Sequence, residues 1–599
     1  MRWQLKSCDD DAATALAASS DLPPALARLL LQRGIDSAER AAAFLQPALA
    51  HLHDPFAMLG MTAAIERLER AIAAKERVLI YGDYDVDGTT AIVILKTCIE
   101  LLGGGAEFHV PHRLREGYGM RDDVLERAKE AGIALVISVD TGIRAFAAAE
   151  TAKRLGLDLI VTDHHLPEAG EGVPHALAVL NPNQDGCTYP CKELCGAGVA
   201  FKVAQAMLTR AGKEKLIPSF LKMVAIATIA DSVPLVGENR VIAKLGLDGL
   251  RRPVNGGLKA LMQVAKLENI DRAINATDIA FRVAPRINAA GRMDIAADVV
   301  ELFTTRDEPR QLELAAKLNL LNTDRQAEEA RILAQIHQRL DSEEELKKSF
   351  CVVITGDGWH RGVIGIAATR VVERTGKPAI VVAVVSGENG ENGEAHGSGR
   401  SIPGFHLLDA LESERCRGLF TRFGGHAHAV GFTMPSDRLP EFCAAMDAHA
   451  RKHLTEADFV PVLAIDAELS FSELTPTFLQ QLQRMEPFGM SNREPVFVVR
   501  GARVMQPPRV LKEKHIKLRI SSSEGDGVGG GGNAKGGRPI DVLAWRMAER
   551  FQSSPLVAGD RLDIAFTLEE NTHPDFGGLQ LVLKDFAVPK LVASAAAEP

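Results

Sequence analysis

The stretch RVLIYGDYDVDGTT, residues 77–90, decides the fold of the chain. Residues 78–81 are apolar and rich in β-forming types, and a glycine follows them, so they predict a short buried strand. Residues 88–90 then open an apolar helix that ends at the glycines 103–105. Between the two elements, three aspartates occupy alternate positions: Asp83, Asp85 and Asp87.

These three carboxylates predict a metal site. At such close spacing they repel one another unless a cation lies between them, and hard divalent cations prefer carboxylate oxygens. The alternative is a solvated acidic turn, which is common in proteins. We favour the metal site because the aspartates follow a buried strand and do not lie in a polar loop.

Two later strand-like stretches end in residues of the same kind. Residues 133–139, IALVISV, lead into Asp140, and residues 157–162, LDLIVT, lead into the triplet DHH at 163–165. A helix-like stretch separates them, and strands that alternate with helices lie parallel in one sheet. The carboxyl ends of parallel strands share one edge, where open α/β folds bind their ligands. We therefore expect four side chains to converge: Asp85, Asp87, Asp140 and His164.

A fourth apolar stretch, MVAIATIA at residues 223–230, ends in Asp231. We add Asp231 to the set, although this stretch can equally be a helix. Aspartates with one or two histidines suit two Mn²⁺ or Mg²⁺ ions better than a structural zinc site, which favours thiolates. Two such ions can activate water and stabilise the attacking and leaving oxygens of a phosphoryl displacement. The predicted reaction is hydrolysis of a phosphate ester or phosphoanhydride.

Motifs along most of the chain resemble those of one family. The D-x-D-x-D run, the strand-ending aspartate and the DHH triplet are similar to the DHH phosphoesterase superfamily. Four later segments resemble the RecJ family of bacterial single-strand-specific 5′→3′ DNA exonucleases: FRVAPRINAAGRM (281–293), GWHRGVIGIAATR (358–370), GSGRS (397–401) and GGHAHAVGF (424–432). The resemblance extends from about residue 54 to about residue 585. It implies an α/β protein with a DHH parallel-sheet domain and a DHH-associated domain joined by a long helix, plus a C-terminal OB-fold β-barrel.

The expected convergence of side chains at the sheet edge and the resemblance to the DHH superfamily together predict the catalytic residues: Asp83, Asp85, Asp87, Asp140, His164, His165 and Asp231. All of them except His165 are predicted metal ligands, and the two histidines serve as ligand or proton carrier. Simpler DHH enzymes have a histidine four residues before the D-x-D pair, whereas this chain has Tyr81 there. Asp83 either substitutes for that histidine or the first metal is held more weakly.

The net charge of −9 is unusual for an enzyme that acts on nucleic acid, because phosphate binding normally requires a basic surface. It predicts a local basic groove in a protein that is acidic elsewhere. Arginines in Gly- and Ser-rich turns are the favoured candidates, since glycine lets backbone N–H groups approach a phosphate. The predicted DNA-binding residues are Arg113, Arg286, Asn288, Arg292, Arg361, Ser398, Arg400, Ser401 and His426.

The resemblance assigns three of these residues, Arg113, Ser398 and Arg400, to the 5′-terminal phosphate. It places His426 near the scissile phosphate or the metals. The plainer alternatives are that each arginine is a solvated surface residue and that a histidine in a glycine turn is structural.

The chain is too long for one hydrophobic core, so several domains are expected. We predict a helical segment (1–55), the phosphoesterase domain (56–300), a long connecting helix (301–348), the DHH-associated domain (349–456), the OB-fold domain (457–590) and a loose tail (591–599). Residues 310–350 contain no Gly or Pro and have apolar residues at helical spacing. This helix either connects two domains rigidly or packs along a single one.

The OB-fold domain is predicted from short alternating strands after about residue 460. Lys512, Lys514 and Lys517 are the predicted contacts to a single-strand backbone. Four aromatic residues could stack bases, although such residues more often belong to the core: Phe488, Phe497, Trp545 and Phe576. The glycine-rich segment 521–537 predicts a disordered insertion in a barrel loop.

Composition and cysteine usage suit a cytoplasmic protein without a membrane segment. No signal-peptide pattern is found at the N-terminus, and no apolar run approaches the length of a membrane span. Cys187, Cys191 and Cys195 recur every four residues, and we interpret them as ordinary buried or loop cysteines, with a zinc site as the minority alternative. We expect a monomer, because the chain already encloses its own cleft.

The sequence therefore predicts a two-metal exonuclease that degrades single-stranded DNA 5′→3′ to 5′-mononucleotides in repair and recombination. One alternative is a DHH phosphodiesterase of short oligonucleotides or cyclic dinucleotides, which would leave the barrel without a use. The other is a non-catalytic single-strand-binding scaffold, whose signature would be lost carboxylates. Partner proteins such as a helicase or a single-strand-binding protein leave no readable pattern.

Overall fold

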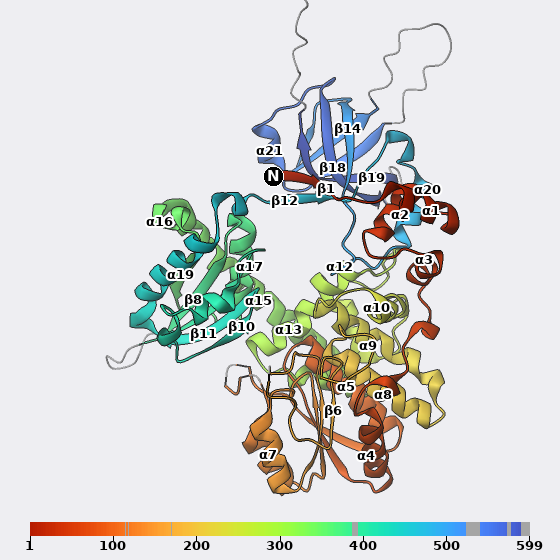
Figure 1. The fold of residues 1–599 in the computed structure, drawn as a ribbon, viewed down its shortest axis with the longest axis vertical. Coiled ribbons are helices and arrows are strands. Elements are labelled where there is room, and N and C mark those ends of the chain that lie inside the picture. Colours follow the sequence, from red (N-terminus) through yellow and green to blue (C-terminus); the bar gives the residue numbers. More distant parts are fainter. Residues whose placement is uncertain are drawn as a thin grey trace, which may run out of the picture. The chain divides into compact units, whose positions relative to one another are not determined.

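The computed structural model describes residues 1–113, 115–117, 119–168, 170–385, 393–522, 539–571 and 577–588. The chain forms two compact units (Figure 1). Unit 1 consists of Met1–Leu52, Pro234–Lys244 and Val462–Pro599, and unit 2 of His53–Val233 and Leu245–Pro461. No helix among the described residues is both long and apolar enough to cross a membrane.

Unit 2 begins with the predicted parallel sheet, which is confirmed. Its strand order is β3-β2-β4-β5-β6, and every neighbouring pair is parallel. The strands are β2 (Arg77–Tyr81), β3 (Gly105–His109), β4 (Leu135–Val139), β5 (Asp158–Thr162) and β6 (Ala178–Leu180). All five residues of β4 are buried, as expected for a central strand with both faces covered.

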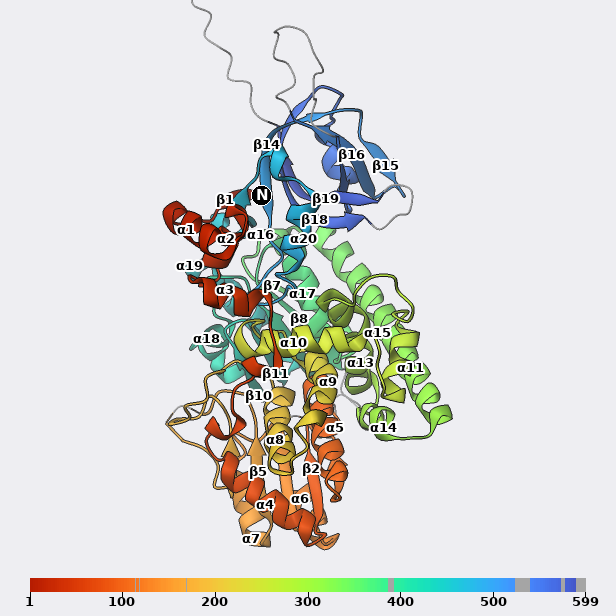
Figure 2. The same cartoon turned by 90° about the vertical axis from the view of Figure 1, so that its right-hand side faces the viewer.

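Helices cover both faces of this sheet (Figure 2). The helices α6 (Asp122–Glu130) and α7 (Phe146–Leu155) share one apolar core with β2, β4 and β5. The helices α4 (Met61–Ala73), α5 (Val86–Leu101) and α8 (Gly196–Arg210) pack together against the sheet on its other side. The carboxyl ends of the strands, which carry the predicted ligands, therefore lie near the N-termini of α5 and α8.

Residues 223–230 are helical and not a strand. They belong to α9 (Ile217–Ala230), and Asp231 is the C-cap residue of that helix. The run mixes alanine, which favours helices, with isoleucine and valine, which favour strands, and packing of α9 against α5 and α8 resolves the ambiguity in favour of a helix. The helix α10 (Gly237–Leu250) follows and crosses from unit 1 into unit 2.

A longer helical run then leads to the second sheet. Its elements are α11 (Gly256–Val264), α12 (Ala276–Asp278), the π-helical segment η4 (Ile279–Val283), α13 (Ala284–Met293), α14 (Ala297–Thr304) and α15 (Glu308–Ser342). The helix α15 has 35 residues, which corresponds to roughly 52 Å. It contacts α11, α13 and α14, and further along, Ile332, Ile336 and Leu340 enter the core of the second sheet.

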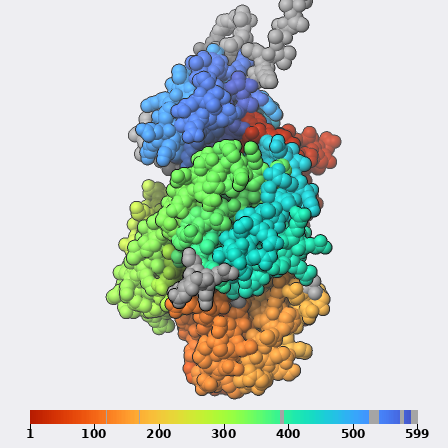
Figure 3. All heavy atoms as spheres, turned by 90° about the vertical axis from the view of Figure 1, so that its left-hand side faces the viewer, coloured from red at the N-terminus to blue at the C-terminus, as the bar shows by residue number. Residues whose placement is uncertain are grey.

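The second sheet has the strand order β10-β11-β9-β8-β7. Its strands are β7 (Val352–Asp357), β8 (Ala379–Val385), β9 (Glu394–Arg400), β10 (Arg422–His426) and β11 (Ala429–Pro435). The helix α17 (Ile364–Thr375) joins the parallel strands β7 and β8. Two further helices, α18 (Leu407–Glu412) and α19 (Leu439–His453), complete its core. Figure 3 shows the surface where the region of α15 and α17 (green) adjoins the later strands and helices (teal).

Unit 1 contains the predicted β-barrel, which is confirmed. Seven strands follow the order β13-β14-β18-β19-β17-β16-β15, and an additional β14–β16 pairing closes the barrel. They are β13 (Ala467–Glu468), β14 (Phe497–Val504), β15 (Arg509–Leu511), β16 (His515–Ser521), β17 (Ile540–Ala544), β18 (Arg561–Asn571) and β19 (Gly578–Ala587). The short strands β1 (Arg2–Leu5) and β12 (Val462–Ile465) pair beside it.

The N-terminal helices share a core with this barrel. They are α1 (Asp10–Ser20), α2 (Pro24–Leu31) and α3 (Ala38–Leu45), and their buried leucines belong to the same cluster as Phe497 and Phe566. Phe497, one of the proposed stacking residues, is fully buried, whereas Trp545 is exposed. Phe576, residues 523–537 of the glycine-rich segment and the tail 591–599 lie outside the described residues.

We predict that the α9–α10 contact depends on Gly246. A Cβ atom at this position would overlap the carbonyl oxygen of Leu221 and the Cβ of Ala225, which are rigid parts of α9. Gly246→Ala should therefore destabilise the protein by about 1–3 kcal/mol through overpacking. The melting temperature by calorimetry should fall.

Gly249→Ala is the matched control on the same helix. A Cβ there would lie 3.1 Å from Cγ of Lys222, a flexible side chain that can move away. Because alanine favours a helix over glycine by about 1 kcal/mol, this variant should melt at the same or a higher temperature. Equal melting temperatures for Gly246→Ala and the wild type would contradict the packing argument.

Candidate metal centre

The loop after β2 is shaped by hydrogen bonds to Asp85. This residue is the N-cap of α5, and its Oδ1 accepts from the backbone N–H of Asp87 (2.9 Å) and of Gly88 (3.1 Å). A Cβ at Gly88 would lie 2.6 Å from the backbone nitrogen of Asp83, so only glycine allows the loop to close this tightly. The local sequence thus presents three carboxylates at one helix N-terminus, where negative charge is favoured.

Asp87 is held by a second helix N-terminus. Its Oδ2 accepts from the N–H of Gly196 (2.6 Å) and its Oδ1 from the N–H of Ala197 (2.7 Å), in the first turn of α8. Each oxygen of this buried carboxylate therefore has a fixed backbone donor, which orients it. Gly196 also packs against Asp140, because a Cβ there would lie 2.6 Å from Asp140 Oδ1.

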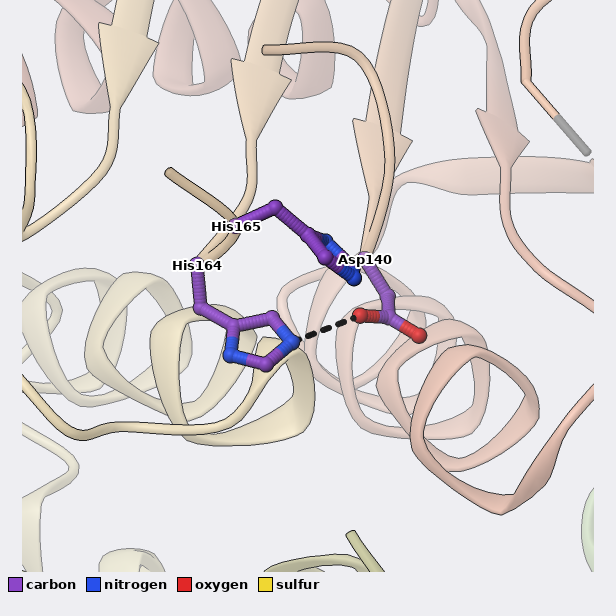
Figure 4. A group of neighbouring side chains, drawn as sticks. All are labelled: Asp140, His164 and His165. Carbon is purple, nitrogen blue, oxygen red and sulfur yellow. Dashed lines mark ion pairs between the residues drawn. The ribbon is translucent and has the colours of Figure 1, made fainter. Parts of the chain in front are cut away.

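Asp140 follows β4 in a left-handed conformation with φ of 57°. Such a conformation is uncommon for a residue other than glycine and concentrates at functional sites. Figure 4 shows its carboxylate pointing toward the ring of His164. The Nε2 atom of His164 lies 3.3 Å from Asp140 Oδ1, 3.7 Å from Asp87 Oδ2 and 3.9 Å from Asp231 Oδ2. His164 therefore lies among carboxylates from three different elements.

Asp163 orients the two histidines. It is fully buried, and its Oδ1 accepts from the N–H groups of His164 (2.8 Å) and His165 (3.2 Å). The same oxygen lies 2.8 Å from Nδ1 of His165, and Oδ2 accepts from the N–H of Ile143. Burial lowers the pKa of His165, but its hydrogen bond and charge interaction with Asp163 outweigh this and raise it to about 8. The DHH triplet contains Asp163, but its position in the sequence does not predict this role.

Three groups of side chains each have their ligand atoms within 4.8 Å of one another: Asp140–His164–His165, Asp87–His164–Asp231 and Asp83–Asp85–Asp140. The structure thus brings together all seven predicted catalytic side chains. Asp140 and His164 are shared between groups, which is the arrangement expected for two neighbouring ions. Asp231 joins the set from the end of a helix, not from a strand.

The donor set fits two hard divalent cations. Burial, followed by the charge of neighbouring aspartates, raises the pKa of Asp83 and Asp140 well above its usual value and that of Asp231 to about 8. Among the described residues, Asp83 Oδ1 is a buried oxygen without a hydrogen-bond partner. Burial lowers the pKa of His164, so its ring is neutral and can act as a ligand. Mn²⁺ or Mg²⁺ would neutralise these carboxylates and use these oxygens.

Arginines gather beside the aspartates. The guanidinium of Arg113 lies 4.8 Å from the ring centroid of Tyr84, within the metal loop. Burial lowers the pKa of Arg292 to about 10, and the charges of Arg113, Arg325 and Arg400 add to this effect, while Asp85 opposes it. We call these four residues the arginine cluster: Arg113, Arg292, Arg325 and Arg400. Arginine side chains that gather in this way can bind an anion such as a phosphate through charge-assisted hydrogen bonds.

Arg325 was not predicted from the sequence. It lies on α15, is buried, and its Nη1 is 2.7 Å from Glu329 Oε2, one turn along the same helix. The only available signal was an arginine at a core-facing position of an otherwise amphipathic helix. The long helix is therefore part of the candidate site as well as a connection between sheets.

Ser398 and Arg400 lie on β9 against the N-terminus of α17. A Cβ at Gly365 would lie 3.0 Å from Ser398 Oγ and 3.2 Å from Arg400 Nη2, so glycine allows the helix end to approach both side chains. Asn288 on α13 accepts from the N–H of Val86, next to Asp85 (3.2 Å). These predicted DNA-binding residues therefore lie at or near the metal loop and the arginine cluster.

Four other predicted DNA-binding residues have different surroundings. Arg286 donates to Asn319 Oδ1 (3.0 Å), Ser401 donates to the carbonyl of Phe405 (2.6 Å), and Arg361 lies 3.9 Å from Glu394. His426 is exposed at the end of β10, where its Nδ1 accepts from the N–H of His428 (3.3 Å). Their assignment to DNA stays a prediction.

The three predicted lysines lie on the barrel of unit 1. Lys517 is on β16, 2.9 Å from Asp541, and Lys512 and Lys514 lie in the turn between β15 and β16. The cysteines 187, 191 and 195 are all buried. In the part of the chain that the structure describes, none of the three metal-binding groups includes a cysteine.

Comparison with known proteins gives the family. The sequence matches the family models for the DHH family N-terminal domain (residues 77–228), the DHHA1 domain (347–452) and the RecJ OB domain (465–585). It is 36% identical to the single-stranded-DNA-specific exonuclease RecJ of Bacillus subtilis over 590 residues, which cover 98% of this chain and 71% of that protein. The chain belongs to the RecJ family.

Two further relatives agree with this assignment. The RecJ exonuclease of Escherichia coli is 34% identical over 540 residues, which cover 86% of this chain and 88% of that protein. The crystal structure of RecJ in complex with Mn²⁺ from Thermus thermophilus superimposes with a TM-score of 0.80 at 28% identity. That match covers 98% of this chain and 80% of the Thermus chain.

We predict that Gly196→Ala damages the metal centre without unfolding the protein. The new methyl group would collide with the Asp140 side chain and push it away from His164. Nuclease activity should fall at least about tenfold, which corresponds to about 1.4 kcal/mol, and half-maximal activity should require more Mn²⁺. The measurement is a Mn²⁺ titration of the initial rate.

Gly198→Ala, two residues further along α8, serves as the control. Its nearest neighbour would be Cδ2 of Leu194 at 3.2 Å, a side chain that can rotate away, and it does not face an aspartate. This variant should keep its activity and its metal requirement. Equal Mn²⁺ titrations for both variants would show that Gly196 does not fix the position of Asp140.

Proposed function

We propose that this protein is a two-metal-dependent exonuclease that degrades single-stranded DNA in the 5′→3′ direction to 5′-mononucleotides. The observation that carries the proposal is the juxtaposition of three overlapping ligand groups with the arginine cluster in unit 2. Membership of the RecJ family supports the substrate, because the relatives are single-stranded-DNA-specific exonucleases.

The side chains divide the reaction between them. When bound, the two divalent ions supply an activated water and stabilise the charge that develops on the phosphate oxygens. Asp87, fixed by the N-terminus of α8, and Asp85, fixed by that of α5, hold the ligand geometry. The Asp163–His165 pair holds a proton at the imidazole Nδ1 and can pass protons at the edge of the site, because the bond to Asp163 raises the pKa of His165 to about 8.

The arginine cluster is the proposed docking site for the 5′-terminal phosphate. Arg113, Arg292 and Arg400 supply charge and planar donors, and Ser398 adds a hydroxyl. The N-terminus of α17 approaches Ser398 and Arg400 at Gly365, and helix N-termini attract phosphate groups. A strand anchored here by its end would present its first phosphodiester to the aspartates beside Arg113.

The two alternative functions are less well supported. A phosphodiesterase of short oligonucleotides or cyclic dinucleotides would have no use for the RecJ OB domain matched at residues 465–585. A non-catalytic scaffold would be expected to lose carboxylates, whereas all seven side chains are present and close together. We further propose that the protein acts as a cytoplasmic monomer in DNA repair and recombination.

The first test is the release of 5′-mononucleotides from a single-stranded DNA oligomer with added Mn²⁺. We expect release by the wild-type protein, no release by Asp140→Ala, and little cleavage of the same sequence as a blunt duplex. Retained DNA binding by Asp140→Ala separates a lost catalytic step from lost folding. DNA binding without any release by the wild type would favour the scaffold.

A second prediction concerns the strand end. Arg400→Ala should reduce the preference for a 5′-phosphorylated oligomer over a 5′-hydroxyl oligomer by about tenfold or more, since a charge-assisted bond is lost. The measurement is kcat/KM on both substrates. Arg374→Ala is the control, because Arg374 lies on α17 but pairs with Asp341 away from the cluster. An unchanged preference in Arg400→Ala would contradict the docking role.

A further inference from the structure

Phe281 is an aromatic residue that the fold leaves in solvent. It is 70% exposed, whereas its neighbours Ile279 and Val283 in the same segment are completely buried. Burying an aromatic ring is favourable, so this exposed ring offers a surface on which a flat ligand can stack. Neither the metal centre nor the arginine cluster uses this residue.

The backbone around Phe281 is unusual. Residues Ile279–Val283 form a π-helical turn that continues directly into α13. π turns are rare and are found frequently at functional sites. A π turn holds one more residue than an α turn, so it changes the direction of the side chains that precede α13.

Arg282 anchors this turn to neighbouring segments. Its guanidinium donates to the carbonyl oxygens of Ala265 (2.7 Å) and Lys266 (2.6 Å), and it lies 3.3 Å from Asp278. Arg272 makes a further 2.6 Å ion pair with Asp278. The backbone next to Phe281 is thus fixed by these contacts, which suits a rigid platform.

Phe281 lies in the π turn that leads directly into α13, three residues before that helix begins. On α13 itself, Asn288 and Arg292 lie one turn apart and therefore share the face that meets the metal loop. Asn288 accepts from Val86 beside Asp85, and Arg292 belongs to the arginine cluster. Gly291 packs against the carbonyl of Tyr84, since a Cβ there would lie 2.5 Å from that oxygen.

We propose that Phe281 is a stacking platform for a nucleobase of the DNA strand, downstream of the bond that is cut. This inference rests on the proposed exonuclease function. The flat ring accepts any base, because every base has a π-face, so the contact holds the strand without selecting a sequence. Seven residues of helix separate Phe281 from Asn288, or roughly 10 Å.

That distance defines which base is stacked. A stacked strand advances roughly 3.4 Å per nucleotide, so 10 Å corresponds to about three nucleotides beyond the metal loop. With the 5′-phosphate in the arginine cluster and the first phosphodiester at the aspartates, the stacked base is one of the third to fifth from the 5′ end. Strands too short to reach Phe281 should be poor substrates.

The test uses 5′-phosphorylated single strands with one abasic residue placed at each position from the second to the eighth. For the wild-type protein, kcat/KM for release of the first nucleotide should fall about 5- to 100-fold when the abasic residue is at positions three to five. Phe281→Ala should lower kcat/KM by a similar factor on the intact strand, and its profile across the series should be flat. Phe281→Trp should restore the wild-type profile.

Val254→Ala is the matched control, because Val254 is 77% exposed in the same unit but is not on α13. It should show the wild-type profile. A flat profile for the wild type, or an unchanged dip in Phe281→Ala, would overturn the stacking role. The intact strand separates the two proposals. If the wild-type protein releases no nucleotide from it, the exonuclease function is wrong. If it releases nucleotides but kcat/KM does not depend on the position of the abasic residue, only the role of Phe281 is wrong.

Discussion

The structure depends on the mutual repulsion of carboxylates that are buried together. Asp83, Asp85, Asp87, Asp140 and Asp231 come from a loop, two helix ends and a strand end, and their ligand atoms approach within a few ångströms. Two of them are held by helix N-termini, which supply fixed partial positive charge. The negative charge of the aspartates that no helix N-terminus offsets is neutralised when divalent cations bind. Metal binding and folding therefore stabilise one another.

Close approach of backbones makes this arrangement possible. Gly88 lets the metal loop close on Asp83, and Gly196 lets α8 reach Asp87 while leaving space for Asp140. A side chain at either position would move a ligand. The glycines near the site are thus determined by the ligand geometry and not by flexibility.

The positive charge of the protein is concentrated near the metal centre. The chain is acidic in total, yet Arg113, Arg292, Arg325 and Arg400 gather beside the aspartates. A phosphate between the arginine cluster and the metals would be attracted from both sides. Net charge alone therefore says little about a nucleic-acid enzyme whose positive groups are few and concentrated.

The sequence by itself determined the parallel sheet, the barrel and the edge at which Asp85, Asp87, Asp140 and His164 converge, because strand periodicity and the direction of βα units are local properties. It could not determine that Asp231 ends a helix, since a short apolar run fits both structures. Only the tertiary structure decided that Asp163 bonds the histidines, that Arg286 bonds Asn319 and that Arg325 joins the arginine cluster. The reason is physical: the role of a charged side chain depends on which distant groups already satisfy it, and sequence spacing does not contain that information.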